Sequence, residues 1–154
     1  MSEGTRFHAR LMLVDDDPAQ ARLWERMLRR GLGKDMVIDV LTDPLAALTY
    51  AQDYSVDILV TDLSMPEICG LDLLRCVKAR NKCAQVLVIT ANSTTAALFE
   101  SIDLGAADYL LKPFQPEVLV DLVRQAVARI DRWREAVAGT YRLGLNKPAP
   151  ASAS

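Results

Sequence analysis

Ile58-Leu-Val-Thr-Asp62-Leu-Ser-Met-Pro66 is a short apolar stretch that ends in a carboxylate and a turn. Apolar and β-branched residues lead into Asp62, as in a strand buried inside a parallel sheet. Ligand sites of open α/β sheets lie at the carboxyl ends of such strands. Asp62 is therefore expected at the edge of a sheet, facing a crevice, although an aspartate at this place could also simply cap the turn.

Four further apolar runs resemble this one and alternate with stretches of helical pattern. Pro18 and Pro44 each follow an aspartate, which is the N-cap-plus-proline signal that begins a helix. Asp17 is interpreted as such a cap. Strands are predicted over residues 11–14, 36–41, 56–61, 86–89 and 109–111, and helices begin at Pro18, at Pro44, after Gly70, after Thr94 or Thr95, and at Pro116.

This alternation predicts an α/β fold, a flavodoxin-like five-stranded parallel sheet with helices on both faces. Right-handed crossovers and the position of the most apolar runs favour the strand order 2-1-3-4-5. The first and third strands then lie side by side, so Asp15, Asp16 and Asp62 meet at one edge. Thr90 and Lys112 end the fourth and fifth strands at the same edge.

Three clustered carboxylates repel one another and call for a cation. Oxygen ligands favour a hard ion, and Mg²⁺ is typically held by a few carboxylates together with waters and a phosphate. With the ion bound, one carboxylate can act as a nucleophile towards phosphorus. The Lys112 ammonium and the Thr90 hydroxyl would then meet the oxygens of a transferred phosphoryl group.

The whole set resembles a response regulator receiver domain of two-component signalling, similar to the chemotaxis regulators, over residues 10 to about 130. The resemblance rests on four pieces in order: Val14-Asp15-Asp16, Asp62 with Met65-Pro66 and Gly70, Thr90-Ala91, and Lys112-Pro113-Phe114. It implies that Asp62 is phosphorylated and that the metal ligands are Asp15, Asp16, Asp62 and the backbone carbonyl of Ser64. It further implies a cis Lys112–Pro113 peptide and a switch formed by Thr90 and Tyr109, although Tyr109 could be an ordinary strand residue with its hydroxyl in water.

The resemblance implies a signalling module and not an enzyme that turns over a metabolite. Phosphate would come from a histidine kinase or a phosphotransfer protein, and the domain would catalyse only its own phosphorylation and dephosphorylation. A haloacid-dehalogenase-like phosphatase is the alternative, but it needs Asp-x-Asp where this chain has Asp62-Leu63-Ser64. A flavin-binding electron carrier of the same fold would need a phosphate loop after the first strand, and none is present.

Composition restricts the classes of partner. The net charge of −2 over 154 residues shows no nucleic-acid footprint, and no apolar run is long enough for a membrane span. The N-terminus does not resemble a signal peptide. Three cysteines, Cys69, Cys76 and Cys83, are interpreted as small buried hydrophobic residues in a cytoplasmic protein, with Cys76 and Cys83 sharing one helical face.

The last helix is expected to be longer than the sheet that it covers. From Pro116 to about Ala138 it would measure roughly 34 Å, whereas a strand spans ~17–20 Å. We therefore divide the chain into an N-terminal extension (1–9), a receiver domain (10–130) and a helical extension with a flexible tail (131–154). The stripe Ile130, Trp133 and Val137 would lie beyond the sheet, as a homodimer surface or a helix leading to an output domain. Alternatively, the segment with Tyr141, Leu143 and Leu145 folds back over it.

Overall fold

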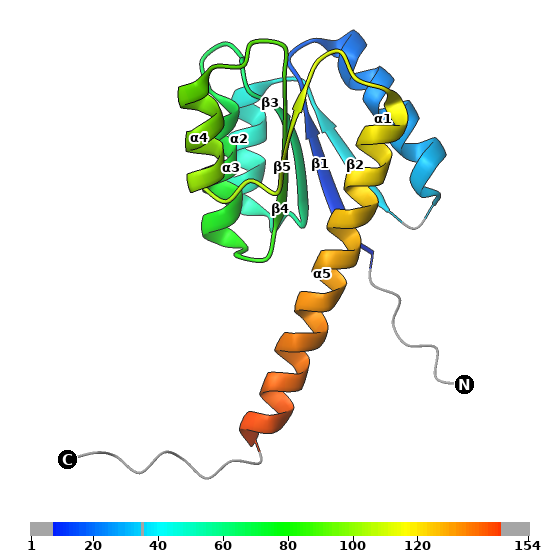
Figure 1. The fold of residues 1–154 in the computed structure, drawn as a ribbon, viewed down its shortest axis with the longest axis vertical. Helices are drawn as coiled ribbons and strands as arrows, with labels where there is room; N and C mark the ends of the chain where they lie inside the picture. The colour runs from blue at the N-terminus through cyan, green and yellow to red at the C-terminus, as the bar shows by residue number, and fades with distance from the viewer. Residues whose placement is uncertain (1–7, 35, 146–154) are drawn as a thin grey trace, which may run out of the picture.

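The computed structural model describes residues 8–34 and 36–145. Five parallel strands form one sheet in the order β2-β1-β3-β4-β5, as predicted. Each strand is followed by a helix, so the fold is the predicted flavodoxin-like arrangement (Figure 1). The strands are β1 (Arg10–Val14), β2 (Val37–Leu41), β3 (Ile58–Asp62), β4 (Gln85–Thr90) and β5 (Asp108–Leu111), and the helices are α1 (Pro18–Leu32), α2 (Pro44–Asp53), α3 (Gly70–Arg80), α4 (Thr95–Asp103) and α5 (Pro116–Leu145).

The three central strands are the most apolar because helices cover both of their faces. Every residue of β4 is buried, and in β1 and β3 only one terminal residue of each is partly exposed. Alternate residues of each strand point to opposite faces. Leu11 and Leu13 of β1 therefore pack in one core, while Met12 and Val14 pack in the other.

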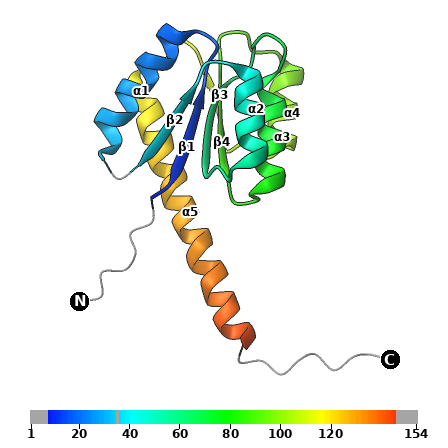
Figure 2. The ribbon, with the colours of Figure 1, turned by 180° about the vertical axis from the view of Figure 1, so that it is seen from behind.

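Two helical layers enclose the sheet. Helices α1 and α5 cover one face, and α2, α3 and α4 lie on the other, as the two opposite views show (Figures 1 and 2). The α1–α5 pair is close, because a Cβ atom at Gly31 would lie 2.5 Å from the side chain of Val120. This layering leaves the ends of the strands open, so functional groups can gather there.

The helix-start signals are confirmed. Asp17 and Asp43 accept the backbone N–H groups of Ala19 and Leu45 at 2.9 and 3.0 Å. Thr94, rather than Thr95, caps α4. Strand ends differ slightly from the prediction: β3 runs from 58 to 62 rather than from 56 to 61, because Asp62 pairs with Ile89 of β4.

The interpretation of the cysteines needs a correction. All three are free and only half-buried. Cys76 lies within α3, but this helix ends at Arg80, before Cys83. The predicted shared helical face of Cys76 and Cys83 is therefore wrong, because the chain turns at Asn81 to enter β4.

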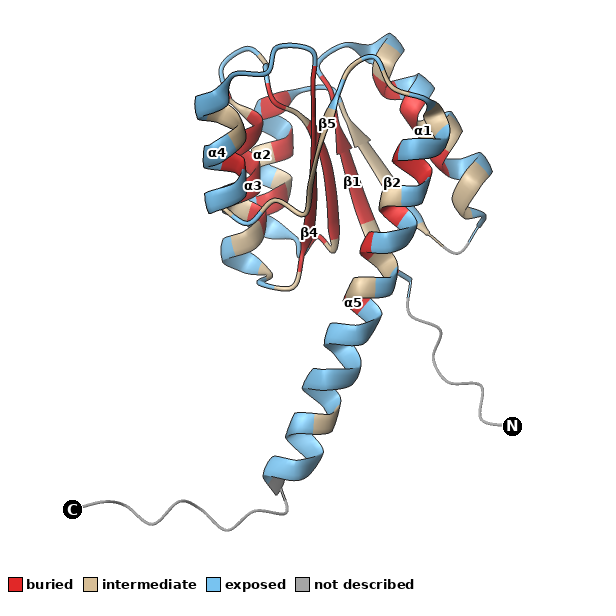
Figure 3. Cartoon of the chain, viewed as in Figure 1, coloured by how far each residue is buried: buried red, intermediate tan, exposed pale blue. Residues whose placement is uncertain are grey.

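Helix α5 is longer than predicted and extends far beyond the sheet. It continues through Gly139 to Leu145, and no proline interrupts it. Tyr141 and Leu143 are therefore exposed helical residues, and the fold-back alternative is wrong. Ile130 is 2% exposed and belongs to the core, whereas most of the helix beyond it is exposed (Figure 3).

The two predicted terminal segments fall partly on residues that the structure does not describe. The predicted extension over residues 1–9 falls mostly on residues that are not described, although Ala9 itself is buried. The tail after Leu145 is also not described, and the division of the chain at residue 130 stays a prediction. No helix among the described residues is long and apolar enough to cross a membrane.

Candidate functional site

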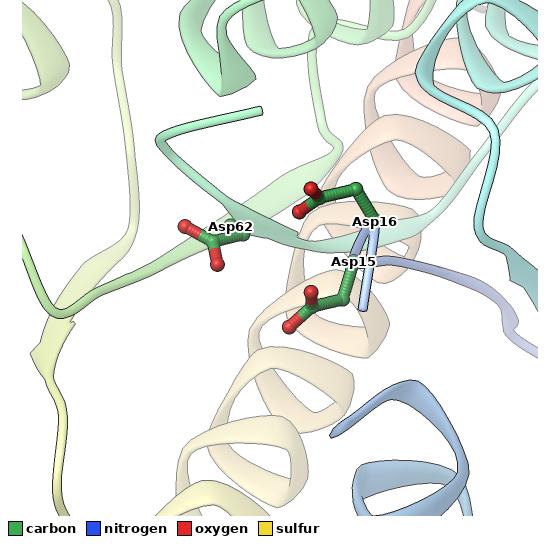
Figure 4. A group of neighbouring side chains, drawn as sticks. All are labelled: Asp15, Asp16 and Asp62. Atoms are coloured by element: carbon green, nitrogen blue, oxygen red, sulfur yellow. The ribbon is translucent and has the colours of Figure 1, made fainter. Parts of the chain in front are cut away.

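The carboxylates of Asp15, Asp16 and Asp62 gather at the carboxyl edge of the sheet (Figure 4). One oxygen of each lies within 4.8 Å of the others. Asp15 and Asp16 directly follow β1, and Asp62 is the last residue of β3. Because β1 and β3 pair in parallel, their carboxyl ends lie side by side, as expected from the strand order.

Asp15 is the buried member of this cluster, with 3% of its surface exposed. Its Oδ1 accepts the backbone N–H of Asp17 at 2.9 Å, which fixes the carboxylate where the chain turns into α1. Burial raises the pKa of the Asp15 carboxyl, and the charge of Asp62 adds to the rise, whereas the Asp17 N–H and the Lys112 ammonium oppose it. The local environment thus disfavours the negatively charged form of the Asp15 carboxyl.

Asp62 is held by the turn that follows β3. Its Oδ1 accepts the backbone N–H of Ser64 at 3.1 Å. The start of α3 packs directly on this turn, because a Cβ atom at Gly70 would lie only 2.3 Å from the carbonyl oxygen of Asp62. Glycine is therefore required at position 70, where Gly70 also donates its N–H to Leu63.

Lys112 joins the cluster from the end of β5. Its Nζ lies 2.9 Å from Asp62 Oδ2, 3.4 Å from Asp15 Oδ2 and 2.6 Å from Gln20 Oε1. An ammonium group has three donors, and here each has an acceptor. Lys112 is therefore not a solvated strand-end charge, but the cation that bridges two of the three carboxylates.

Thr90 and Tyr109 lie on neighbouring strands beside this cluster. Thr90 is fully buried, and its Oγ1 accepts the backbone N–H of Asn92 at 3.0 Å. The Tyr109 hydroxyl lies 3.0 Å from Ser93 Oγ, so it is not simply solvated. The backbone N–H of Lys112 donates to the carbonyl of Thr90, which links the ends of β4 and β5.

Three contacts of this region were not predicted from the sequence. Gln20 contacts Lys112 from the first turn of α1, and its position just after the aspartates was the available signal. Ser93 meets Tyr109 across a loop, for which no sequence signal exists. Phe114 stacks on Trp24 with ring centroids 4.7 Å apart, and this contact holds the segment after the cis Lys112–Pro113 peptide against α1.

The donor set fits a hard divalent cation. It consists of three carboxylates, with no sulfur or imidazole among them. Lys112 neutralises only one of the three negative charges, so the cluster retains an excess of negative charge when all are ionised. Carboxylate oxygens are the ligands that Mg²⁺ takes in proteins, usually with several waters.

Comparisons with known proteins agree with this geometry. The family model for the response regulator receiver domain matches residues 11–124. The nitrate/nitrite response regulator protein NarP of Escherichia coli is 33% identical over 124 residues, which are 80% of this chain and 56% of NarP. The DNA-binding response regulator MtrA of Mycolicibacterium smegmatis is 34% identical over 120 residues, 78% of this chain and 51% of MtrA. The chain thus spans about half the length of these relatives.

Solved structures show the same fold. A CheY-like receiver domain protein of Methanospirillum hungatei superposes with a TM-score of 0.75 at 18% identity, covering 82% of this chain and 98% of the other. The receiver domain of a putative Luxo repressor protein of Vibrio parahaemolyticus gives 0.75 at 21%, covering 84% and 98%. Neither the family match nor these structures support the phosphatase alternative. The chain belongs to the response regulator receiver domain family.

Proposed function

We propose that this receiver domain accepts a phosphoryl group on Asp62, in a Mg²⁺-dependent transfer from a histidine kinase or a phosphotransfer protein. The observation that carries the proposal is the meeting of Asp15, Asp16 and Asp62 within 4.8 Å, with Lys112 bound to two of them. Such an arrangement costs electrostatic free energy. A site that binds a cation and a phosphoryl group accounts for it.

The metal would be held by the carboxylates of Asp15, Asp16 and Asp62 and by the backbone carbonyl of Ser64. Bound there, Mg²⁺ would neutralise charge on the phosphoryl oxygens. The half-buried Asp62 carboxylate is positioned by the Ser64 N–H on one oxygen and by Lys112 on the other. Asp15 is positioned by the Asp17 N–H on one oxygen and by Lys112 on the other.

In the transfer, an oxygen of Asp62 forms a bond to phosphorus while the bond from phosphorus to the donor's imidazole nitrogen breaks. The electron pair of the broken bond stays on the imidazole. The Lys112 ammonium lies 2.9 Å from Asp62 and can follow the phosphoryl oxygens. No proton has to leave Asp62, because the reacting form is the carboxylate.

The response to phosphorylation would start at Thr90. Its hydroxyl oxygen accepts the Asn92 N–H, so its own proton can be donated to a phosphoryl oxygen. A shift of Thr90 would disturb the loop through Ser93, which contacts the Tyr109 hydroxyl. This path supports a role for Thr90 and Tyr109 as the switch that alters partner or output activity.

The domain would therefore work as a signalling component in the cytoplasm, not as an enzyme acting on a metabolite. MtrA is named as a DNA-binding regulator. We propose that the matched region of this chain makes no nucleic-acid contact of its own, because the chain carries a net charge of −2. Any DNA-binding output would then depend on a partner or on a further domain.

Intact-mass analysis tests the proposal. Incubation with Mg²⁺ and an acyl phosphate as donor should add one phosphoryl group to the native protein and none to Asp62→Asn. Asp17→Asn is the matched control, because asparagine also caps helices and Asp17 is outside the metal cluster. It should be labelled like the native protein. Undiminished labelling of Asp62→Asn would show that Asp62 is not the acceptor.

A further inference from the structure

The part of α5 beyond the core, residues 131–145, carries an apolar stripe that nothing in the described chain covers. We call this part the overhang. It continues the spacing of Val123, Ala126 and Ile130, which pack against the sheet. In the overhang the same stripe consists of Trp133, Val137, Thr140 and Gly144. Trp133 is 52% exposed and Val137 45%.

A groove runs beside this stripe. It has a volume of about 360 Å³ and lies between the overhang and the amino edge of the sheet. The helix side of the groove is lined by Ile130, Trp133, Arg134, Val137 and Ala138, and the domain side by Asp57, Asn81 and Cys83. The Arg134 guanidinium lies 3.6 Å from the Asp57 carboxylate across it. The groove lies at the end of the sheet opposite to Asp62, so its occupant need not touch the phosphorylation site.

No described part of the chain packs against two glycines of the overhang. Gly139 and Gly144 are helical, and a Cβ atom at either would meet nothing within 4 Å. Glycine weakens a helix relative to alanine. A glycine on a helix face leaves room for a side chain of a neighbouring helix, as at Gly31, where Val120 of α5 packs. Gly144 offers the same opportunity on the exposed stripe.

We propose that the overhang pairs in antiparallel orientation with the overhang of a second copy of this chain. With residue 132 of each copy opposite residue 145 of the other, Trp133 of each copy lies opposite Gly144 of its partner. Val137 lies opposite Thr140 in the same register. We call this contact between the two overhangs the seam. A large residue meets a glycine in its two outer layers, and side chains of similar size meet in its two inner layers. The end of one helix enters the groove of the other copy.

The antiparallel orientation follows from the position of the stripe. Up to Ile130 the stripe faces the sheet of its own domain. A parallel partner on the same stripe would carry its own sheet into the space that this sheet fills, and Trp133 would oppose Trp133. An antiparallel partner has its domain at the far end of the overhang, so the two domains do not collide.

The size of the seam sets the expected affinity. Fifteen residues measure about 22 Å, and the seam has two large apolar side chains per copy on the stripe, with Tyr141 and Leu143 at its flanks. Such a contact lies at the low end of specific interfaces, below about 1,200 Å². The dimer should therefore form reversibly, with a dissociation constant on the order of micromolar or weaker.

Light scattering over a concentration series of the full chain tests the dimer. The native protein should pass from monomer to dimer as its concentration rises. Trp133→Glu should weaken the dimer at least about thirtyfold, as for a large aromatic anchor that the contact buries. Arg132→Glu, on the outer face of the same helix, should leave it unchanged. A native protein that stays monomeric up to about 1 mM, or equal dimerisation of Trp133→Glu, overturns the proposal.

Disulfide cross-linking tests the orientation. Oxidation of a mixture of Trp133→Cys and Gly144→Cys should link the two variants through residues 133 and 144. Gly144→Cys alone should not link to itself, because its two copies would lie about 16 Å apart along the seam, too far for a disulfide. Self-linking of Gly144→Cys above the level of the native chain would show a parallel pair. Asp62 labelling should remain native in every variant, so this outcome is independent of the proposed phosphorylation.

Discussion

The two ends of the sheet expose different kinds of surface. At the carboxyl edge, three carboxylates surround one lysine, and every donor of that lysine is engaged. At the amino edge, the overhang exposes Trp133 and Val137 beside a groove. The first end has an excess of negative charge, and the second has an excess of apolar surface.

This difference separates the physical forces that act at each end. Charge repulsion is strong where groups are buried and is relieved by a cation of the right size. Apolar surface is indifferent to cations and is relieved by contact with another apolar surface. Substitutions and ions directed at one end should therefore leave the other end almost unaffected, and the predictions below test this independence.

The largest effect is expected from Gly70→Ala at the carboxyl edge. The added Cβ would lie 2.3 Å from a backbone oxygen of Asp62, and backbone cannot rotate away as a side chain can. We expect a loss of about 3 kcal/mol in the free energy of unfolding, together with reduced phosphorylation. Urea denaturation measures the loss. Native stability of Gly70→Ala would mean that the turn after β3 is looser than described.

Magnesium should stabilise the carboxyl edge alone. At a hundred times its dissociation constant the ion adds about 2.7 kcal/mol, which corresponds to a rise in Tm of roughly 5–11 °C for a domain of this size. The rise should be much smaller in Asp16→Ala, which loses a carboxylate of the cluster. Trp133→Glu should show the full rise. Equal shifts in native protein and Asp16→Ala would place the ion elsewhere.

The buried Asp15 should make stability depend on pH in the absence of Mg²⁺. Its pKa in the folded state is raised above 3.8 by burial. Its contribution to stability is therefore full below pH 3.8 and is lost as the pH rises through the higher folded pKa. Asp15→Asn keeps an oxygen for the Asp17 N–H and should be more stable than the native protein at pH 7, by on the order of 1 kcal/mol.

Denaturation with urea at several pH values measures this difference, which should shrink towards pH 4. Asp17→Asn is the control, because it changes an exposed capping carboxylate of the same helix. A native protein more stable than Asp15→Asn at pH 7 without Mg²⁺ would show that the contacts of the carboxylate outweigh the cost of burying it.

The smallest effect is expected at the amino edge. Gly139→Ala adds a Cβ that meets nothing, and alanine favours the helix by up to about 1 kcal/mol. The helical signal in circular dichroism should rise slightly, with phosphorylation and Mg²⁺ binding unchanged. A loss of helicity would mean that Gly139 is not an ordinary position of α5. The same substitution, glycine to alanine, should therefore destabilise the protein at position 70 and slightly favour the helix at position 139.

The sequence alone determined the strand order and the residues of the acidic cluster. Apolar runs of strand length, Asp-Pro helix starts and parallel pairing are sufficient to place Asp15, Asp16 and Asp62 at one edge. This works because each signal is local: a strand end fixes the position of the residue that follows it, and the topology does the rest.

Contacts between distant segments could be decided only by the tertiary structure. Gln20 reaches Lys112 across 92 residues, Ser93 meets Tyr109, and Phe114 stacks on Trp24. The same holds for α5, whose apolar stripe is continuous in the sequence but is buried only as far as Ile130. Helical spacing shows which side of a helix is apolar. How far that side is buried depends on the length of the sheet beneath it, because burial requires a second surface in contact with the helix.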